Sequence, residues 1–312
     1  MMTNFIQKYV SLNDKNWFKT GGKAQFFVEP KTTKEFSQAI LFAKANALPI
    51  FVLGKGANIL ISDEGFSGLV IHPQLKQIEF NSETNELTAG AGVTISDLIN
   101  CCLDNNLSGL EEFSGIPGTV GGSVYINIHY YQFLLSDFLT SATIICKDTG
   151  ITQMVSNSWF EFGYDRSKLH EGTYSLVSAT FKLKPISELE TAYARGRQTE
   201  IIRHREKRYP RERTCGSFFR NFLKEEYAQA QKGTQVPYVA YYLDKVGIKG
   251  SLRVGNAVVS YLHANMLVTE PEATSNDVIT LARQMQERVF TEFGILPQPE
   301  CELIGFKEYP LL

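Results

Sequence analysis

The chain has 312 residues, a formal net charge of −2, 43% hydrophobic residues and 21% charged residues. These values are typical of a globular protein with a large core, and they exclude a low-complexity or highly charged disordered chain. The balanced charge argues against general nucleic-acid binding. No apolar run approaches the ~20 residues of a membrane helix. Residues 1–14 lack the basic and apolar regions of a secretion signal, so we expect a cytoplasmic protein.

The cysteines are odd in number and show no CxxC spacing. They are Cys101, Cys102, Cys146, Cys215 and Cys301. Neither a zinc site nor a disulfide framework is therefore expected, and we predict reduced thiols and no metal.

Strands and helices alternate through the first 190 residues. Residues 25–29 and 49–54 are expected strands on either side of a helix over 32–47, which Thr32 or Thr33 can cap. This pattern predicts a small β-α-β unit. A second helix is expected over 94–106, and further strands at 69–72, 78–89, 141–146, 151–155 and 174–183.

The sequence changes character near residue 190. Residues 187–208 predict a long charged helix that ends before Pro210, and a charge run of this kind is usually a solvated face. We place a domain boundary at 190–210. The elements expected beyond it are helices at 224–232, 236–246 and 275–293, the last capped by Asn276-Asp277, and strands at 256–260 and 265–269.

Two glycine-rich segments each lie beside a predicted strand. They read Gly54-Lys-Gly-Ala-Asn-Ile-Leu60 and Gly115-Ile-Pro-Gly-Thr-Val-Gly-Gly122. Glycines let backbone N–H groups approach a phosphate closely, so the two loops together could hold a dinucleotide. Taken singly, each is also an ordinary turn. The first lacks the GxGxxG spacing of a Rossmann fingerprint.

Two later segments supply a hydroxyl and a carboxylate. Residues 215–222 read Cys-Gly-Ser-Phe-Phe-Arg-Asn-Phe, and Glu300 lies in Gly-Ile-Leu-Pro-Gln-Pro-Glu-Cys-Glu-Leu-Ile-Gly. Ser217 suits a hydroxyl in an apolar pocket beside an anion-binding arginine. A reaction that builds negative charge next to a carbon needing a proton would use both groups. Taken singly, they are a loop serine and a surface carboxylate.

The chain resembles the UDP-N-acetylenolpyruvoylglucosamine reductase family from about Asn16 to Gly305. The resemblance rests on nine segments in order: Phe18-Lys-Thr-Gly-Gly22, Leu53–Leu60, Ser62-Asp-Glu-Gly-Phe-Ser-Gly68, Ile116–Gly122, Phe162-Gly-Tyr164, Gly216–Asn221, Arg253-Val-Gly255, His263-Ala-Asn265 and the Glu300 segment.

The resemblance implies an α+β fold. An FAD-binding domain of the vanillyl-alcohol-oxidase (PCMH) type would consist of two subdomains, residues 1–75 and 76–190, followed by an α+β substrate-binding domain at 191–312. The short interval from Tyr164 to Ser217 is similar to the family branch that lacks an extra substrate-covering insertion. We expect a monomer.

The same resemblance implies the chemistry. NADPH would deliver hydride to non-covalent FAD, and UDP-N-acetylglucosamine enolpyruvate would be reduced to UDP-N-acetylmuramate for peptidoglycan synthesis. Ser217 matches the proton donor and Glu300 the catalytic glutamate. The expected cofactor-binding residues are Gly54, Lys55, Gly56, Ala57, Asn58, Ile59, Gly118, Thr119, Gly121, Gly122 and Asn127.

The UDP-sugar is expected to contact Tyr164, Arg205 and Asn221. Arg205, together with Lys207 and Arg208, could pair with the diphosphate or belong to a solvated surface. Two other functions stay open: a related FAD oxidase that acts on another substrate, and a non-catalytic homologue that binds flavin or a UDP-sugar.

Three positions depart from the family pattern. The family has Arg-x-Ser after Phe-Gly-Tyr, whereas this chain has Asp165-Arg-Ser167, and we expect Arg166 to take over the contact with the substrate carboxylate. Residues 128–133 read Ile-His-Tyr-Tyr-Gln-Phe in place of Ala-Gly-Ala-Tyr-Gly-Gly, so only Tyr131 matches. Phe222 stands where the family has proline.

Overall fold

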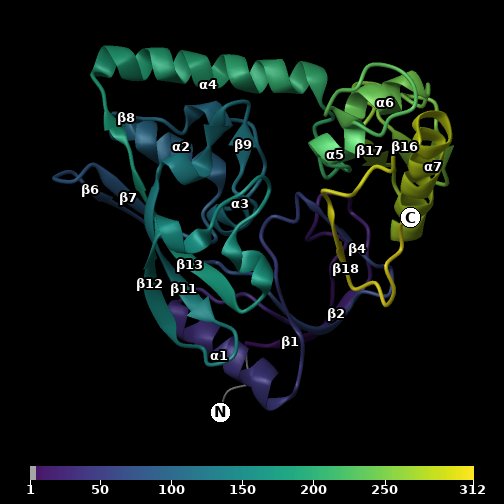
Figure 1. Cartoon of the computed structure of the whole chain (residues 1–312). Helices are drawn as coiled ribbons and strands as arrows, with labels where there is room; N and C mark the ends of the chain where they lie inside the picture. The colour runs from purple at the N-terminus through teal and green to yellow at the C-terminus, as the bar shows by residue number, and fades with distance from the viewer. Residues whose placement is uncertain (1–4) are drawn as a thin grey trace. The chain divides into compact units, whose positions relative to one another are not determined.

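The computed structural model describes residues 5–312, which fall into two compact units (Figure 1). Unit 1 contains the described residues up to Tyr9 together with Gln25–Lys55 and Ser67–Arg205. Unit 2 contains Val10–Ala24, Gly56–Phe66 and Glu206–Leu312. Two N-terminal segments therefore belong with the C-terminal third of the chain.

Helix α1 (Thr33–Ala45) confirms the predicted 32–47 helix and its cap. The Thr32 hydroxyl accepts a hydrogen bond from the Glu35 N–H. The face Phe36, Ala39, Ile40 and Ala43 is buried. It packs against the sheet with the strand order β1-β2-β5-β3, formed by β1 (Gln7–Ser11), β2 (Lys23–Val28), β5 (Phe66–Ile71) and β3 (Ile50–Val52).

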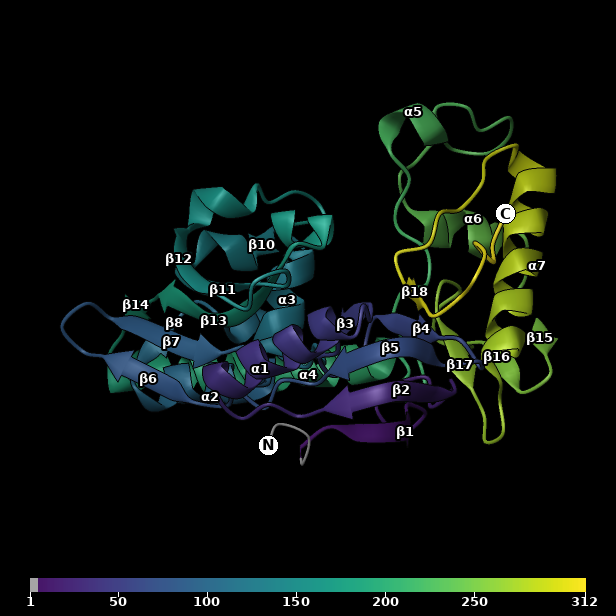
Figure 2. The ribbon, with the colours of Figure 1, turned by 90° about the horizontal axis from the view of Figure 1, so that it is seen from below.

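A five-stranded antiparallel sheet forms the larger core of unit 1. Its order is β12-β11-β13-β7-β6, with β6 (Ile78–Asn81), β7 (Glu86–Gly90), β11 (Leu139–Cys146), β12 (Thr152–Ser156) and β13 (Tyr174–Lys182) (Figure 2). The predicted strand at 78–89 is in fact the hairpin β6–β7. The strand breaks because Asn81 Oδ1 accepts from the N–H groups of Glu83 and Thr84, and Asn85 is left-handed (φ 54°).

Helix α2 (Ile95–Asp104) confirms the 94–106 prediction, since its buried face includes Ile95, Leu98, Ile99 and Cys102. The glycine segment 115–122 was expected to be loop throughout, but helix α3 (Val120–Ile126) begins within it. The remaining short elements of unit 1 are β8 (Leu107–Ser108), β9 (His129–Tyr130), β10 (Phe133–Leu134) and β14 (Lys184–Pro185), with 3₁₀ turns at Glu111–Phe113, Leu135–Asp137, Asn157–Phe160 and Lys168–Glu171.

Helix α4 (Glu188–Arg208) confirms the predicted charged helix, and its buried residues are Thr191, Ala194 and Ile201. Unit 2 is built on helix α7 (Ser275–Phe293), which packs with helix α6 (Val239–Lys245) and the sheet of β15 (Arg253–Val254), β16 (Ala257–Val259) and β17 (Leu267–Thr269). Strand β18 (Glu302–Ile304) pairs in parallel with β4 (Ile59–Ile61). Figure 1 shows these two strands side by side, although they lie at opposite ends of the sequence.

Three boundaries in unit 2 differ from the prediction. The expected helix at 224–232 is the single turn α5 (Lys224–Tyr227), because the following polar segment turns to hydrogen-bond Phe293 O through the Gln231 N–H. Helix α6 starts after Pro237, not at residue 236. The cap of α7 is Thr274, and the Asn276 N–H instead donates to Asp63.

No helix within residues 5–312 is both long enough and apolar enough to cross a bilayer.

A buried amide on α7 allows a test of this packing. Gln286 is fully buried; its Nε2 donates to Pro297 O (2.8 Å) and its Oε1 accepts from the Leu312 N–H (3.1 Å). Gln286→Leu leaves both backbone groups without this partner, so the free energy of unfolding should fall by about 1–3 kcal/mol. Urea denaturation measures the change. Gln284→Leu, at a partly exposed position of the same helix, is the matched control and should shift stability by less than about 0.5 kcal/mol.

Candidate active site

The backbone of residues 217–220 is paired on both sides within unit 2. On one side, Ser217 lies opposite Met266 in an antiparallel bridge, and the Phe218 N–H donates to Asn265 O (2.9 Å). On the other side, Phe218 O accepts from the Glu300 N–H (2.9 Å). The two segments that carry the predicted hydroxyl and carboxylate are therefore adjacent.

Asn265 fixes the register of this pairing. Its Nδ2 donates to Phe219 O (2.7 Å), and its Oδ1 accepts from the Phe219 N–H (3.0 Å). The side chain is buried, so both bonds are shielded from water. Asn265 was not among the predicted site residues, although the segment His263-Ala-Asn265 contributed to the resemblance. The sequence signal was thus present but was not connected to Ser217.

The surroundings of Ser217 differ from expectation in one respect. Phe218 and Phe219 are buried, and Ser217 is partly exposed. The nearby Arg220, expected to bind an anion, forms a two-pronged pair with Glu226 (2.7 and 2.8 Å). The hydrogen bonds from Arg220 hold the pKa of Glu226 below its ordinary value. This arginine therefore anchors helix α5.

Two cysteines flank the paired segments, Cys215 before Ser217 and Cys301 after Glu300. Both are buried and carry free thiols. Burial raises the pKa of Cys301 well above its ordinary value, and the hydrogen bond with Cys215 raises it further. A buried thiol that resists ionisation packs as a small apolar group and is a poor nucleophile.

The predicted glycine loop 54–59 is divided between the units. In unit 1, a Cβ added at Gly54 would lie 2.8 Å from Thr119 Oγ1, so this glycine and the segment 118–122 meet. Thr119 caps α3 by accepting from the Gly122 N–H. The Gly121 N–H donates to Ala91 O (2.9 Å). Because Gly54 and Gly121 lack side chains, these backbone segments of unit 1 can approach their neighbours closely.

In unit 2, Gly56 (φ 64°) packs so tightly that a Cβ would lie 2.6 Å from Asn16 Cα. Asn58 Nδ2 lies 3.4 Å from Glu300 O. Asn58 Oδ1 is buried and has no partner among residues 5–312. Lys55 is exposed, Ala57 is partly buried, and Ile59 begins β4.

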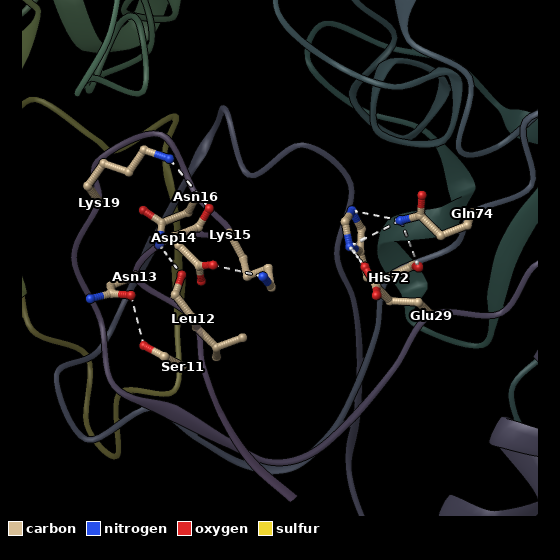
Figure 3. A network of polar contacts seen from close by, with 10 residues as sticks. All are labelled: Ser11, Leu12, Asn13, Asp14, Lys15, Asn16, Lys19, Glu29, His72 and Gln74. Carbon is tan, nitrogen blue, oxygen red and sulfur yellow. Dashed lines mark hydrogen bonds and ion pairs between the residues drawn. The ribbon is translucent and has the colours of Figure 1, made fainter. Parts of the chain in front are cut away.

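Two further polar residues of unit 2 were missed by the sequence predictions. Asn16 Nδ2 donates to Leu12 O (2.7 Å), as Figure 3 shows, and also to Thr20 O (2.8 Å). Asn16 Oδ1 and Thr20 Oγ1 are buried without a partner in the part of the chain that the structure describes. Unpartnered buried polar atoms are costly. Together with Asn58 Oδ1, they fit a site that receives polar groups of a bound cofactor.

Three of the remaining predicted residues lie close together in unit 1. Asn127 is left-handed (φ 51°), and its Nδ2 donates to Gly163 O (3.3 Å). Tyr164 follows and is exposed. The backbones of Gly163 and Arg166 close a turn through bonds of 2.9 and 3.4 Å, with the Arg166 side chain exposed. The bulky segment 128–133 forms the hairpin β9–β10.

The other two candidates for substrate binding have structural contacts as well. The Arg205 guanidinium lies 5.6 Å from the ring centre of Tyr130. The aliphatic part of the Arg205 side chain packs against Gly115, where an added Cβ would lie 3.2 Å from Arg205 Cδ. In unit 2, Asn221 Oδ1 accepts from the Val239 N–H (3.3 Å) at the start of α6. No group of three or more His, Cys, Asp or Glu side chains within residues 5–312 could hold a metal ion.

Comparison with known proteins identifies the family. Residues 24–155 match the FAD binding domain, and residues 208–304 match the C-terminal domain of UDP-N-acetylenolpyruvoylglucosamine reductase. The UDP-N-acetylenolpyruvoylglucosamine reductase of Caldicellulosiruptor saccharolyticus is 34% identical over 96% of this chain and 92% of its own length. That of Synechococcus sp. (strain JA-3-3Ab) is 30% identical over 98% and 94%.

The chain belongs to the UDP-N-acetylenolpyruvoylglucosamine reductase family.

A solved member of this family supports the fold. The crystal structure of the UDP-N-acetylenolpyruvylglucosamine reductase from Thermus caldophilus matches with a TM-score of 0.77 and 27% identity, covering 96% of this chain and 100% of that chain. The predicted α+β fold with an FAD-binding domain is confirmed.

His263 lies beside Asn265 in the candidate site of unit 2, and we expect it to make the stability of the fold depend on pH. Its Nδ1 accepts from the Asn265 N–H (3.2 Å). Burial lowers the pKa of His263, and the charges of Arg208 and Lys249 lower it further. Because folding favours the neutral ring, its contribution to stability is complete above about pH 6.5 and is lost as the pH falls through the folded pKa.

His263→Asn keeps an acceptor for Asn265 but cannot titrate. We expect its free energy of unfolding to fall less than that of the parent between about pH 7.5 and about pH 5. Chemical denaturation at each pH measures the difference. Identical pH profiles for the two proteins would show that His263 is not responsible.

Proposed function

We propose that the chain is an NADPH-dependent reductase that converts UDP-N-acetylglucosamine enolpyruvate into UDP-N-acetylmuramate, a step of peptidoglycan precursor synthesis. The observation that carries this proposal is the pairing of the Ser217 segment with Glu300 through Phe218 O. Non-covalently bound FAD would accept hydride from NADPH and pass it to the substrate. The protein's own groups must then bind, orient and protonate the substrate.

Ser217 is proposed to give its hydroxyl proton to the substrate carbon that becomes saturated. A serine hydroxyl is a weak acid in water, so it needs neighbours that stabilise the alkoxide formed. Glu300 is the proposed catalytic glutamate. Its backbone N–H is held by Phe218 O, which fixes where its side chain starts. This gives Ser217 and Glu300 a common scaffold in unit 2.

The proposed cofactor residues fit a bound FAD on two counts. The contact between Gly54 and Thr119 leaves no room for a side chain between them. The buried Asn58 Oδ1 lacks a partner among the described residues. The residues proposed to line the FAD site are Gly54, Lys55, Gly56, Ala57, Asn58, Ile59, Gly118, Thr119, Gly121, Gly122 and Asn127.

Tyr164, Arg205 and Asn221 are the proposed contacts to the UDP-sugar. The ring of Tyr130 orients the Arg205 guanidinium, which supports a role in holding an anion more than one in surface solvation. We also propose functional segments at 1–75, 76–190 and 191–312, a monomeric state and a cytoplasmic location.

A non-catalytic homologue that binds flavin or a UDP-sugar is the second candidate. It is favoured by the bulky hairpin β9–β10 and by Asp165, a carboxylate where an anionic substrate needs a cation. The decisive measurement is whether the purified protein binds FAD, is bleached by NADPH and regains its colour when UDP-N-acetylglucosamine enolpyruvate is added. Bleaching without recovery of colour favours the second candidate.

Ser217→Ala tests the proposed proton donor. NADPH should reduce the flavin at the parental rate, because the hydroxyl acts only after hydride reaches the substrate. Reoxidation by the substrate should be slower by about 10²–10⁴-fold. Stopped-flow absorbance separates the two half-reactions. Ser251→Ala, at an exposed serine of unit 2, is the control. Parental reoxidation in Ser217→Ala would remove this serine from the mechanism.

Arg166→Met tests whether the displaced arginine meets the substrate carboxylate. Removing one charge donor should slow reoxidation by roughly 10²–10³-fold with unchanged flavin content. Arg195→Met on α4 is the control, since Arg195 pairs with Asp104 in unit 1. A parental rate in Arg166→Met would show that Arg166 is only a surface residue.

A further inference from the structure

Two of the departures from the family pattern contact each other in unit 1. His129 stands in the 128–133 segment, and Asp165 occupies the position directly after Tyr164. His129 Nδ1 lies 3.3 Å from Asp165 Oδ1. The side chains keep 30% and 17% of their accessible surface, so the pair is partly shielded but still reachable. Two residues 36 positions apart, both of which depart from the family pattern, are therefore in contact.

Asp165 lies in a turn that is closed by backbone hydrogen bonds. It has a left-handed conformation (φ 51°), which aspartate tolerates better than most residues. The turn around it is closed by the two backbone bonds between Gly163 and Arg166 and is tied to Asn127 through Gly163 O. Asp165 Oδ2 is buried and has no partner within residues 5–312. Asp165 therefore contacts His129 through its other oxygen, Oδ1.

His129 connects the pair to the proposed substrate contacts. It begins β9, opposite Leu134 in the hairpin. Its ring centre lies 4.9 Å from that of Tyr164, at an angle of 44°. The polar contact of the His129 ring with Asp165 is made by Nδ1. The imidazole therefore contacts both Asp165 and Tyr164, and the contact with Asp165 does not use Nε2.

The chemistry of the pair follows from the charges. A lone carboxylate at this place would repel a substrate that carries a carboxylate and a diphosphate. An imidazole whose Nδ1 lies against a carboxylate, as here at 3.3 Å, presents Nε2 on the opposite side of the ring. With both nitrogens protonated it is a cation with two donors, so Nε2–H can bind an anion.

We infer that His129, oriented by Asp165, is a further catalytic residue that donates from Nε2 to the carboxylate of the enolpyruvyl substrate as negative charge builds there. Asp165 is a positioning residue that acts through His129. The inference rests on the proposed function, and it adds a second hydrogen-bond donor beside Arg166. No proton is transferred in this step; the hydrogen bond shortens as the oxygen becomes more negative.

His129→Gly is the primary test, with His72→Gly as its matched control. His72 lies in the same unit and also pairs with a carboxylate, with Nδ1 3.1 Å from Glu29 Oε1 (Figure 3). We expect His129→Gly to keep the parental FAD content, thermal midpoint and rate of reduction by NADPH. Reoxidation by UDP-N-acetylglucosamine enolpyruvate should slow by about 10²-fold, and added imidazole should restore part of the rate. His72→Gly should match the parent in every measurement.

Asp165→Asn tests the positioning role. It should slow reoxidation less than His129→Gly does. The double variant should be no slower than His129→Gly alone, because residues that act as a unit are not additive. Calorimetric titration with the substrate adds a readout independent of turnover: His129→Gly should bind it more weakly than the parent.

The outcomes separate the inference from the proposed function. If the parent turns over the substrate and His129→Gly does so at the same rate, the inference is overturned. It is also overturned if reoxidation, FAD content and thermal midpoint fall together, since the pair would then only hold the hairpin to the turn. If the parent itself is not reoxidised by this substrate, the proposed function fails, and the inference fails with it.

Discussion

The carbonyl of Phe218 accepts hydrogen bonds from the backbone N–H groups of Glu300 (2.9 Å) and Cys301 (3.3 Å), and the candidate site of unit 2 depends on this contact. Each functional side chain lies next to a paired backbone atom: Ser217 precedes Phe218, and Glu300 supplies one of the donors. Since these bonds use main-chain atoms, they place both side chains whatever the side chains themselves are. Asn265 then fixes the register with two further bonds to Phe219.

The same unit contains polar atoms that the described residues leave unpaired. Asn16 Oδ1, Thr20 Oγ1 and Asn58 Oδ1 are all buried without partners within residues 5–312. Each such atom costs about 1–3 kcal/mol if nothing satisfies it. A ligand that offers donors to these oxygens would recover that free energy on binding. It would also stabilise the folded chain, because ligand binding and folding are thermodynamically linked.

The sequence was informative where local rules decide structure. Helices α1 and α2 were predicted because apolar residues recur with helical spacing, and α1 also because a threonine can cap it; both features act over a few residues. Helix α3 was hidden because Gly121 and Gly122 are poor helix formers; it forms through the Thr119 cap and the burial of Val120 and Val124. The β4–β18 pairing was not predictable, since its partners are about 240 residues apart and no local pattern links them.

The candidate site shows the same division between local and long-range information. The sequence revealed that position 165 had lost the family's arginine and that the 128–133 segment had become bulky, as two separate departures. Only the fold shows that His129 and Asp165 contact each other. A carboxylate in place of arginine, taken alone, reverses the charge and argues against catalysis. In contact with His129, whose ring also lies beside Tyr164, the same carboxylate instead belongs to the proposed donor pair. The contact between these two positions means that a change at either one alters the surroundings of the other.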